Sequence, residues 1–254
     1  GLLAFPIAFH LFRNLKDRGY AFAKPMGLLL VSYTLWIAGY SHLVPNGRGT
    51  VVLLTILLAG LSAWLYYRSW SSITAYVRAT RGGIIAGEAV FLAIFVLFAS
   101  LRGLDPGINH TEQRMDFAFL NAIVRSPSFP PNDPWLSGSG ISYYYFGYLM
   151  FAFVTMLSGV TSSIAFNLAL ASIAALAASG AFSIVSNITS GKGPLKGGYI
   201  YGGFAVLFLL ILGNLEGLLE LLRSAGLAAT AFWQWVSIKG LDGPDASSKL
   251  LPTD

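Results

Sequence analysis

The sequence predicts an all-α fold, a polytopic bundle of transmembrane helices, and three observations support this prediction. Hydrophobic residues make up 55% of the 254 residues and charged residues only 11%, whereas soluble domains carry about 25% charged residues. The charges are also missing from whole segments, among them residues 51–67, 89–101 and 164–188. Apolar runs of about 18 residues or more are long enough to cross a hydrocarbon core of about 30 Å as a helix. We therefore expect a multi-pass protein of the cell membrane, in contact with the lipid bilayer.

Residues 1–104 are expected to contain the N-terminal transmembrane helices and one cytoplasmic helix at the membrane surface. The apolar helices expected there, in chain order, are residues 1–12, 26–44, 50–67 and 88–104. A basic turn at residues 13–24 follows the first of them. Residues 68–87 combine three arginines with tryptophan and tyrosine, which is typical of a helix that lies on the membrane surface.

Residues 105–160 are expected to form a long extracytoplasmic loop with juxtamembrane helices, followed by a Tyr-rich segment. The loop is polar, and its second half is rich in Pro, Gly, Asn and Ser. The Tyr-rich segment at residues 143–157 has about 15 residues, fewer than the roughly 20 that a span needs. Residues 161–217 return to transmembrane helices, with the last span at residues 199–215, and residues 218–254 are expected to be another extracytoplasmic loop.

The basic residues decide the expected orientation. If the turn at residues 13–24 faces the cytoplasm, the loop at residues 105–140 lies outside. If the Tyr-rich segment and the next apolar helix both crossed the membrane, Lys192 and Lys196 would lie outside. Such a position conflicts with the rule that lysine and arginine are enriched in short loops on the cytoplasmic side. The conflict disappears if residues 143–157 are re-entrant or juxtamembrane and roof a cavity, because incomplete helices at membrane depth are buried in protein or line a cavity. The alternative is a plain short span with two misplaced lysines.

Composition excludes several kinds of chemistry. The chain has no cysteine, so disulfides, thiolate metal sites and cysteine nucleophiles are excluded. The net charge is +5, but no segment clusters Lys and Arg, so we expect no nucleic-acid partner. A Walker loop, a dinucleotide-binding turn and a His-x-x-x-His pair are all absent from the sequence. Gly1 is not an initiator methionine, and we expect the rest of a longer chain, or other membrane subunits, as partners.

Two carboxylates mark a candidate site in the expected outer loop. Glu112 and Asp116 stand at i and i+4 of an amphipathic segment that also carries Arg114 and Arg125, so the two carboxylates share one helix face. Such a pair can hold a divalent cation or supply a general base. The alternative, commoner on spacing alone, is a solvated face in which Arg114 and Arg125 are the ion-pair partners.

Aromatic residues follow the acidic segment. A proline-rich turn ends in Asp133, Pro134 and Trp135, and Asp133 can cap that turn. Tyr143, Tyr144 and Tyr145 are adjacent in the sequence. Tyrosines can stack on a sugar ring or fix a membrane interface, and the second use is the commoner.

Glu216 is a third acidic candidate, inside the sequence Gly213-Asn-Leu-Glu-Gly217 at the end of the last expected span. A carboxylate so close to hydrocarbon is costly and indicates function. The Gly-x-x-x-Gly spacing is equally typical of a helix-packing face that happens to include a glutamate. The sequence leaves both interpretations open.

Several blocks of the sequence resemble the YYY membrane-protein family, whose members are uncharacterised. These blocks are Asp17-Arg-Gly-Tyr20, Met115-Asp-Phe-Ala-Phe-Leu-Asn-Ala122, Pro130-Pro-Asn-Asp-Pro-Trp135 and Tyr143-Tyr-Tyr-Phe-Gly-Tyr148. The resemblance covers most of the chain. Members of the family are longer than 254 residues, in line with the expectation that this chain is part of a longer one.

More distantly, the order of elements is similar to that of GT-C glycosyltransferases. Those proteins have an acidic residue on a juxtamembrane helix of the first outer loop, then an acidic turn with tryptophan, then an aromatic segment near the interface. Asn214-Leu-Glu216 is similar to a second acidic motif of that superfamily, with Glu in place of Asp. The departures are that three full spans precede the loop instead of one, and that a Lys-Pro pair before the aromatic segment is absent.

The GT-C resemblance implies a glycosyltransferase that takes a sugar from a polyprenyl-phosphate donor on the extracytoplasmic side. Asp116 would be the general base. Charge on the leaving phosphate would be neutralised by arginine or by a divalent cation, and aromatic side chains would contact substrate. The implied substrate-binding residues are Arg114, Arg125, Trp135, Tyr143, Tyr144 and Tyr145, and the implied metal ligands are Glu112 and Glu216. The rival class is a non-catalytic structural or accessory subunit of a membrane complex.

Overall fold

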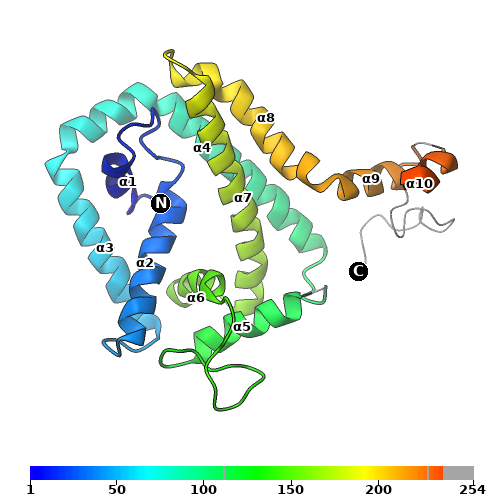
Figure 1. Cartoon of the computed structure of the whole chain (residues 1–254). Coiled ribbons are helices and arrows are strands. Elements are labelled where there is room, and N and C mark those ends of the chain that lie inside the picture. The colour runs from blue at the N-terminus through cyan, green and yellow to red at the C-terminus, as the bar shows by residue number, and fades with distance from the viewer. Residues whose placement is uncertain (111, 228, 237–254) are drawn as a thin grey trace.

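The computed structural model describes residues 1–110, 112–227 and 229–236, without the side chains of residues 214, 216–218, 220 and 221. This part is helical and contains no strand, which confirms the all-α prediction (Figure 1). The α-helices are α1 (Phe5–Leu11), α2 (Ala23–Tyr40), α3 (Arg48–Arg68), α4 (Trp70–Leu104), α5 (Gln113–Arg125), α6 (Phe146–Ser158), α7 (Ser162–Thr189), α8 (Tyr199–Leu210), α9 (Leu215–Ser224) and α10 (Thr230–Val236). Two short 3-10 helices, η1 (Leu195–Gly198) and η2 (Leu212–Asn214), flank α8.

Helices α3, α4 and α7 are long and apolar enough to cross a membrane. Helix α2 is not one of them, because its 18 residues include Lys24, Pro25 and several polar or aromatic side chains. Large apolar side chains on α3 and α4 point outward, for example Ile56 at 60% and Leu92 at 60% exposure. Such exposure over whole helices suits contact with lipid rather than with water. The prediction of a multi-pass membrane protein is confirmed.

Two predicted elements differ from the structure. The surface helix expected at residues 68–87 and the span expected at residues 88–104 form the single helix α4 of 35 residues, because no proline interrupts its backbone hydrogen bonds. The prediction of one continuous last span at residues 199–215 is wrong. Helix α8 stops at Leu210, and η2 separates it from α9. Gly213 and Asn214, which lie in η2, are poor helix formers.

The bundle has two ends, which are tied together by different segments. At the basic end (residues 13–22 and 190–198), the backbone N–H of Lys16 donates to Asn187 Oδ1 at 2.9 Å, and Lys16 Nζ donates to the Gly193 carbonyl at 2.6 Å. At the loop end (residues 41–47 and 105–161), Asn46 Nδ2 donates to the carbonyls of Ile123 and Ser126 at 2.6 and 2.7 Å. Helices α2 and α4 therefore run from the basic end to the loop end, and α3 and α7 run back.

Helix α6 does not pass between the two ends. Near its start, Tyr148 contacts Asp116 of α5, and just after its end Ser162 Oγ lies 2.8 Å from Asn121 Oδ1, also of α5. Both ends of this 13-residue helix thus lie beside α5. Lys192 and Lys196 consequently lie at the basic end with Lys16. Which side of the membrane each end faces stays a prediction.

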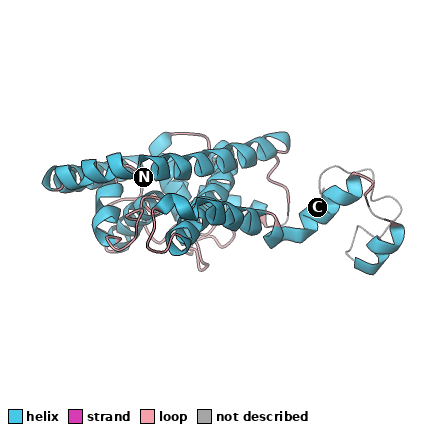
Figure 2. Ribbon diagram, turned by 90° about the horizontal axis from the view of Figure 1, so that it is seen from above, coloured by secondary structure: helices cyan, strands magenta, loops and turns pink. Residues whose placement is uncertain are grey.

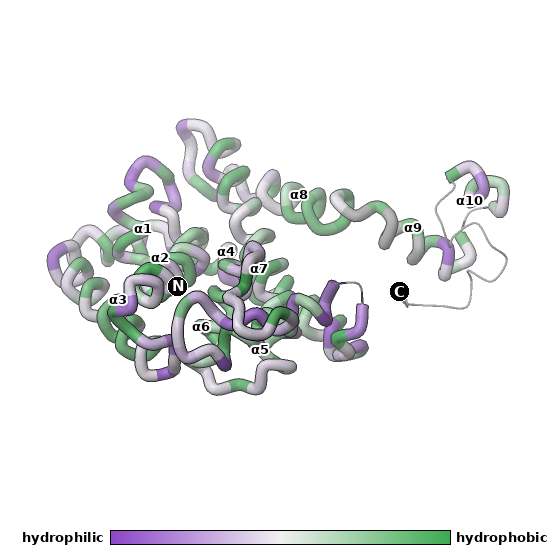
Figure 3. The backbone as a smooth tube through the Cα atoms, turned by 60° about the horizontal axis from the view of Figure 1, so that its bottom comes forward, coloured by the Kyte–Doolittle hydropathy of each residue, from purple (hydrophilic) through white to green (hydrophobic). Residues whose placement is uncertain are grey.

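The main apolar core lies near the loop end. It packs α5 and α6 against the facing parts of α2, α3 and α7, through the buried side chains Leu35, Val51, Phe119, Leu120, Ile123, Leu149, Phe153 and Phe166. Seen from above, the chain after α8 extends away from this bundle (Figure 2). Coloured by hydropathy, the tube is mostly hydrophobic along the helices and turns hydrophilic at several connections (Figure 3).

Candidate functional site

Helix α5 is the scaffold of the candidate site. Its apolar face buries Phe119, Leu120 and Ile123, and its other face carries the polar residues that the sequence singled out. Asn46 fixes the C-terminal end of α5 by donating to the carbonyls of Ile123 and Ser126. The last carbonyls of a helix have no partner within the helix and need a donor from elsewhere. The helix is therefore held on both its apolar face and its end, and its polar side chains have a fixed base.

Asp116 is held by a tyrosine of α6. Tyr148 donates its hydroxyl to Asp116 Oδ1 at 2.5 Å, and Asp116 is only partly buried. Burial raises the pKa of Tyr148, and the bond to Asp116 raises it further, so this hydroxyl stays protonated and keeps donating at neutral pH. Within the part of the chain that the structure describes, Asp116 Oδ2 has no hydrogen-bond partner. The carboxylate is thus oriented through one oxygen and open at the other.

A cluster of aromatic rings includes Tyr148, the partner of this carboxylate. The Phe119 ring stacks on Tyr143 at 5.3 Å and 16°, meets Trp135 edge-on at 5.3 Å, and lies 5.7 Å from the Tyr148 ring. Tyr144 covers Tyr143 at 3.9 Å. We call these five residues the aromatic platform. Trp135 and Tyr144 are its open members, at 61% and 72% exposure.

Within the platform, Tyr143 donates its hydroxyl to Tyr144 at 2.5 Å. This bond is lost when Tyr143 ionises. It is the main reason why the pKa of Tyr143 is raised to about 12. Tyr143 is consequently protonated at physiological pH, and its hydroxyl keeps donating to Tyr144.

The proline-rich turn positions Trp135. Asp133 Oδ1 accepts hydrogen bonds from the backbone N–H groups of Trp135 and Leu136 at 2.8 and 2.9 Å, so Asp133 caps this turn. Phe129 at the start of the turn is buried against Gly39 of α2. The turn is therefore anchored at both ends, and it holds the indole at the edge of the platform.

The three adjacent tyrosines separate in space. Tyr143 and Tyr144 join the platform, whereas Tyr145 is buried and reaches α2. Its hydroxyl accepts from Trp36 Nε1 at 2.9 Å and lies 2.8 Å from the Tyr40 hydroxyl. Tyr145 thus ties the start of α6 to the loop end of α2, and it does not face the platform.

The other predicted site residues are less concentrated. Arg114 and Arg125 are both exposed but stand at opposite ends of α5, about 16 Å apart along its axis. Glu112 is exposed just before α5. In residues 1–110, 112–227 and 229–236 the ion pairs are Lys24–Glu88 and Asp105–His110, so neither arginine pairs with Glu112 or Asp116 there.

The side chain of Glu216 lies outside the described part of the chain. Its backbone begins α9, which Figure 1 shows well away from α5. Gly213 is exposed, and a Cβ there would meet only the Phe208 carbonyl at 3.6 Å. Gly213 is therefore not a close-packing position between the described helices.

Sequence reasoning missed Tyr148 and Phe119, which hold Asp116 and the platform together. The signal for Phe119 was present, since it stands one turn after Asp116 on the same amphipathic helix. Tyr148 lies 32 residues from Asp116, and no local pattern links the two. Its place in the Tyr143–Tyr148 block was the only hint.

An apolar cavity lies behind α6. Its volume is about 530 Å³, and it is bounded by α2, α3, α4, α6 and α7. The C-terminal half of α6, residues 153–158, lines it, and Lys24 is its one charged lining residue among those described. Lys24 pairs with Glu88, and both also line a neighbouring cavity of about 590 Å³. Helix α6 therefore stands between the Asp116 site and a space of the size that small-molecule pockets have.

A helical chain with three membrane-crossing helices and a polar, aromatic site at one end of the bundle is a multi-pass membrane protein. The chain belongs to the family of uncharacterized membrane proteins DUF2298, which it matches over residues 30–242. No curated protein and no solved structure matches it.

Proposed function

We propose that the chain is a GT-C-like membrane glycosyltransferase, or a part of one, with Asp116 as its general base. The observation that carries this proposal is the orientation of the Asp116 carboxylate, held through Oδ1 by Tyr148 and open at Oδ2 beside the aromatic platform. A catalytic base needs a fixed direction and a free oxygen within reach of the acceptor proton. Asp133 is also held through Oδ1 alone, but by the backbone N–H groups of the turn that it caps, whereas Asp116 is held by a side chain of the aromatic platform.

The proposed reaction moves a sugar from a polyprenyl-phosphate donor to an acceptor hydroxyl. Asp116 Oδ2 takes the hydroxyl proton while the acceptor oxygen bonds to the anomeric carbon. The bond from that carbon to the phosphate oxygen breaks, and the polyprenyl phosphate leaves with the electron pair. One base is sufficient for such an inverting displacement, provided that the charge on the leaving phosphate is neutralised.

Arg114 and Arg125 are the proposed source of that positive charge. Both are exposed, and neither is neutralised by an acidic side chain in the described residues. Their separation along α5 means that one phosphate contacts one of them. Arg114 is nearer to Asp116 along the axis of α5, at about 3 Å against about 14 Å for Arg125. Positions two apart do not share a helix face, so the long Arg114 side chain has to reach around α5 to the leaving phosphate that we assign to it, and Arg125 makes a second polar contact.

The platform and the cavity supply the other two contacts. Tyr144 and Trp135 expose aromatic surface on the platform, whose member Tyr148 bonds to Asp116, and such surface stacks on the apolar side of a sugar ring. The apolar cavity of about 530 Å³ behind α6 suits the lipid tail, since burial of apolar surface stabilises a bound chain by about 25 cal/mol per Å². Tyr145 supports the platform from behind, through α2.

The resemblance also implied a divalent cation held by Glu112 and Glu216, and the steps above do not use one. Such a cation takes six or more oxygen ligands. Among the described residues there is no group of three acidic, histidine or cysteine side chains, and Glu112 alone does not fit the requirement. No step is therefore assigned to a cation.

The test is the Asp116→Asn variant in purified, reconstituted protein. Release of polyprenyl phosphate is measured by mass spectrometry from polyprenyl-phosphate mannose or glucose, with delipidated membrane extract as the source of acceptor. Loss of a positioned base reduces the rate about 10²–10⁴-fold. Asp105→Asn is the matched control, because Asp105 is a loop-end aspartate that pairs with His110 instead. A folded Asp116→Asn protein with the full rate would end the catalytic assignment and favour the accessory subunit.

A further inference from the structure

The basic end of the bundle contains a pocket that the proposed function does not use. Its volume is about 740 Å³, and it lies between the turn at residues 13–18, the stretch 79–83 of α4 and residues 193–199. Four bases line it, Arg13, Lys16, Arg18 and Lys196. Segments almost 180 residues apart in the chain thus bring their positive charges to one concavity.

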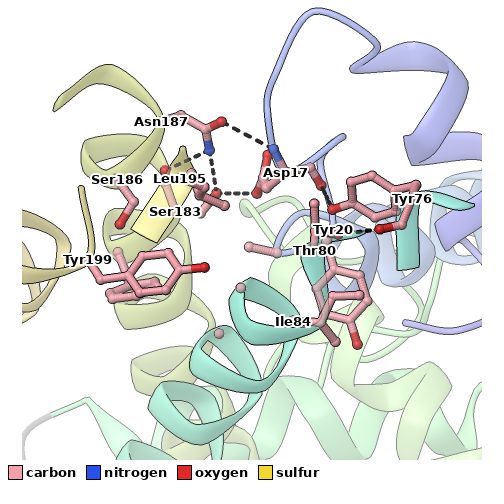
Figure 4. A pocket seen from close by; sticks show the side chains of 14 residues that line it. Asp17, Tyr20, Tyr76, Thr80, Ile84, Ser183, Ser186, Asn187, Leu195 and Tyr199 are labelled. Atoms are coloured by element: carbon pink, nitrogen blue, oxygen red, sulfur yellow. Dashed lines mark hydrogen bonds between the residues drawn. The ribbon is translucent and has the colours of Figure 1, made fainter. Parts of the chain in front are cut away.

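Among the residues that the structure describes, no acidic side chain lines this pocket. Asp17 lies among three of the bases in sequence, but it is only 7% exposed and points toward α7. Ser183 Oγ donates to Asp17 Oδ2 at 2.5 Å (Figure 4). The backbone N–H of Gly19 donates to Asp17 Oδ1 at 3.1 Å. Both oxygens of the nearest carboxylate are therefore occupied away from the pocket, and the bases are left without an acidic partner in it.

The walls of the pocket are fixed before any ligand arrives. Lys16 is held through its backbone N–H by Asn187 and through Nζ by the Gly193 carbonyl. The Arg18 guanidinium lies 5.1 Å from the Phe9 ring centroid. Tyr76 donates to the Asp17 carbonyl at 2.6 Å, which fastens the turn to α4. A pre-formed site of this kind loses little conformational entropy on binding.

The floor of the pocket is made of small residues. Ala79, Gly82 and Gly83 of α4 line it, and a Cβ on Gly82 would meet no atom within 4 Å. This leaves room for a group larger than a single water or chloride beside the bases.

The two helices that border the pocket, α4 and α8, carry exposed apolar side chains further along the chain. Ile85 of α4 and Ile200 of α8 are 65% and 66% exposed, and Phe204, one turn further on, is 50% exposed. A basic concavity followed by exposed apolar helix surface matches a lipid, whose headgroup is anionic and whose chains are apolar. Basic pockets between membrane helices bind such headgroups.

We propose that this pocket binds the headgroup of an anionic phospholipid from the leaflet at the basic end, with the acyl chains against α4 and α8. The phosphate lies among Arg13, Lys16, Arg18 and Lys196, where charge-assisted hydrogen bonds are strongest. The site is independent of the proposed transfer, because it lies at the opposite end of the bundle from Asp116.

The test compares dioleoyl phosphatidylglycerol, dioleoyl phosphatidylcholine and inorganic phosphate, each added to delipidated protein in neutral detergent. Binding is followed by native mass spectrometry and by the rise in melting temperature that a native-state ligand causes. We expect saturable binding of phosphatidylglycerol only. The Arg13→Gln/Lys196→Gln variant should bind it about 30-fold more weakly, given the usual contribution of two bases near a membrane surface.

The matched control is Arg68→Gln/Arg78→Gln, which removes the same charge from α3 and α4 but from residues that do not line the pocket. It should bind phosphatidylglycerol within about threefold of the wild type. If both double variants bound phosphatidylglycerol equally weakly, the binding would come from diffuse electrostatic attraction, and the proposal of a specific pocket would be wrong. If inorganic phosphate or phosphatidylcholine saturated the site as phosphatidylglycerol does, the assignment of the ligand as an anionic phospholipid would be wrong. If the pocket variant melts lower without lipid, the single Lys196→Gln variant provides the same comparison.

Discussion

Asp17 and Asp116 lie at opposite ends of the bundle, and each accepts a hydroxyl hydrogen bond of 2.5 Å, from Ser183 and Tyr148 respectively. Their second oxygens differ. Asp17 is buried, and its other oxygen accepts from the Gly19 backbone. Asp116 is partly exposed, and its other oxygen is open in the described chain. The same donor and acceptor chemistry therefore makes a structural anchor where both oxygens are occupied and an available base where one is not.

The two ends also differ in what lies next to the aspartate. Around Asp17, helix η1 and helix α8 pack backbone to backbone against α7, because a Cβ on Gly198 would lie 2.3 Å from the Ser186 carbonyl. Asp116 is instead held by the side chain of Tyr148 of α6, which lies beside the Phe119 ring of α5. The basic end is thus closed by main chain, and the loop end is closed by side chains that can move aside for a ligand.

The largest expected difference is in stability after truncation of each aspartate. Asp17→Ala leaves the Ser183 hydroxyl and the Gly19 N–H buried without an acceptor, and we expect a loss of about 3 kcal/mol. Asp116→Ala frees a hydroxyl that water can reach, so the loss should be about 1 kcal/mol or less. Thermal unfolding of both variants in the same detergent measures the difference. Equal shifts would mean that the two sites do not differ as anchors.

A second prediction contrasts main-chain with side-chain closure. Gly198→Ala drives a methyl group into the Ser186 backbone, and overpacking of this kind costs about 1–3 kcal/mol. Gly39→Ala meets the Phe129 ring at 2.1 Å instead, and a ring can shift, so its effect should be near the low end of that range. Gly203→Ala is the control, since nothing lies within 4 Å of its Cβ and alanine favours a helix by about 1 kcal/mol. A stable Gly198→Ala protein would contradict close packing at the basic end.

The two hydroxyl donors give a third, smaller contrast. Ser183→Ala and Tyr148→Phe each remove one hydrogen bond to an aspartate. The loss of stability should be about 1–2 kcal/mol for Ser183→Ala and about 1 kcal/mol or less for Tyr148→Phe, because water can reach the second bond. Only Tyr148→Phe should also slow sugar transfer, by about tenfold, because it releases the orientation of the proposed base. The measurement is kcat and KM for both variants beside their melting temperatures. A parallel fall of kcat in Ser183→Ala would refute a role confined to the loop end.

The smallest expected effect is a titration at the platform. The bond from Tyr143 to Tyr144 raises the pKa of Tyr143 to about 12, above an ordinary tyrosine value of about 10. A raised pKa stabilises the fold below the unfolded value, and this contribution is lost as the pH rises from about 10 through about 12. Ultraviolet titration of tyrosinate in Tyr144→Phe should show Tyr143 ionising at lower pH, with Tyr143→Phe identifying its signal. An unchanged titration would mean that the two hydroxyls are not bonded.

Local patterns in the sequence predicted much of the candidate site. The i, i+4 spacing predicted one helix for Glu112 and Asp116, and the structure places Asp116 in α5 and Glu112 just before its first residue. The turn before Trp135 is capped by Asp133, as its composition suggested. The three adjacent tyrosines were predicted as one group, yet Tyr145 turns inward to Trp36 and Tyr40 while its two neighbours stay at the platform. A run of like residues carries no information on which member faces which partner.

Hydropathy over one segment at a time is sufficient to predict that this protein is helical, that it belongs in a membrane and where most helices begin. Which aspartate is buried depends on contacts between distant segments. Asp17 meets Ser183 across 166 residues, and Asp116 meets Tyr148 across 32. The tertiary structure also decided that the last predicted span breaks after Leu210. The physical reason is that burial and hydrogen-bond satisfaction depend on what distant segments bring to the same place, and a one-dimensional pattern records only the residues that each segment offers.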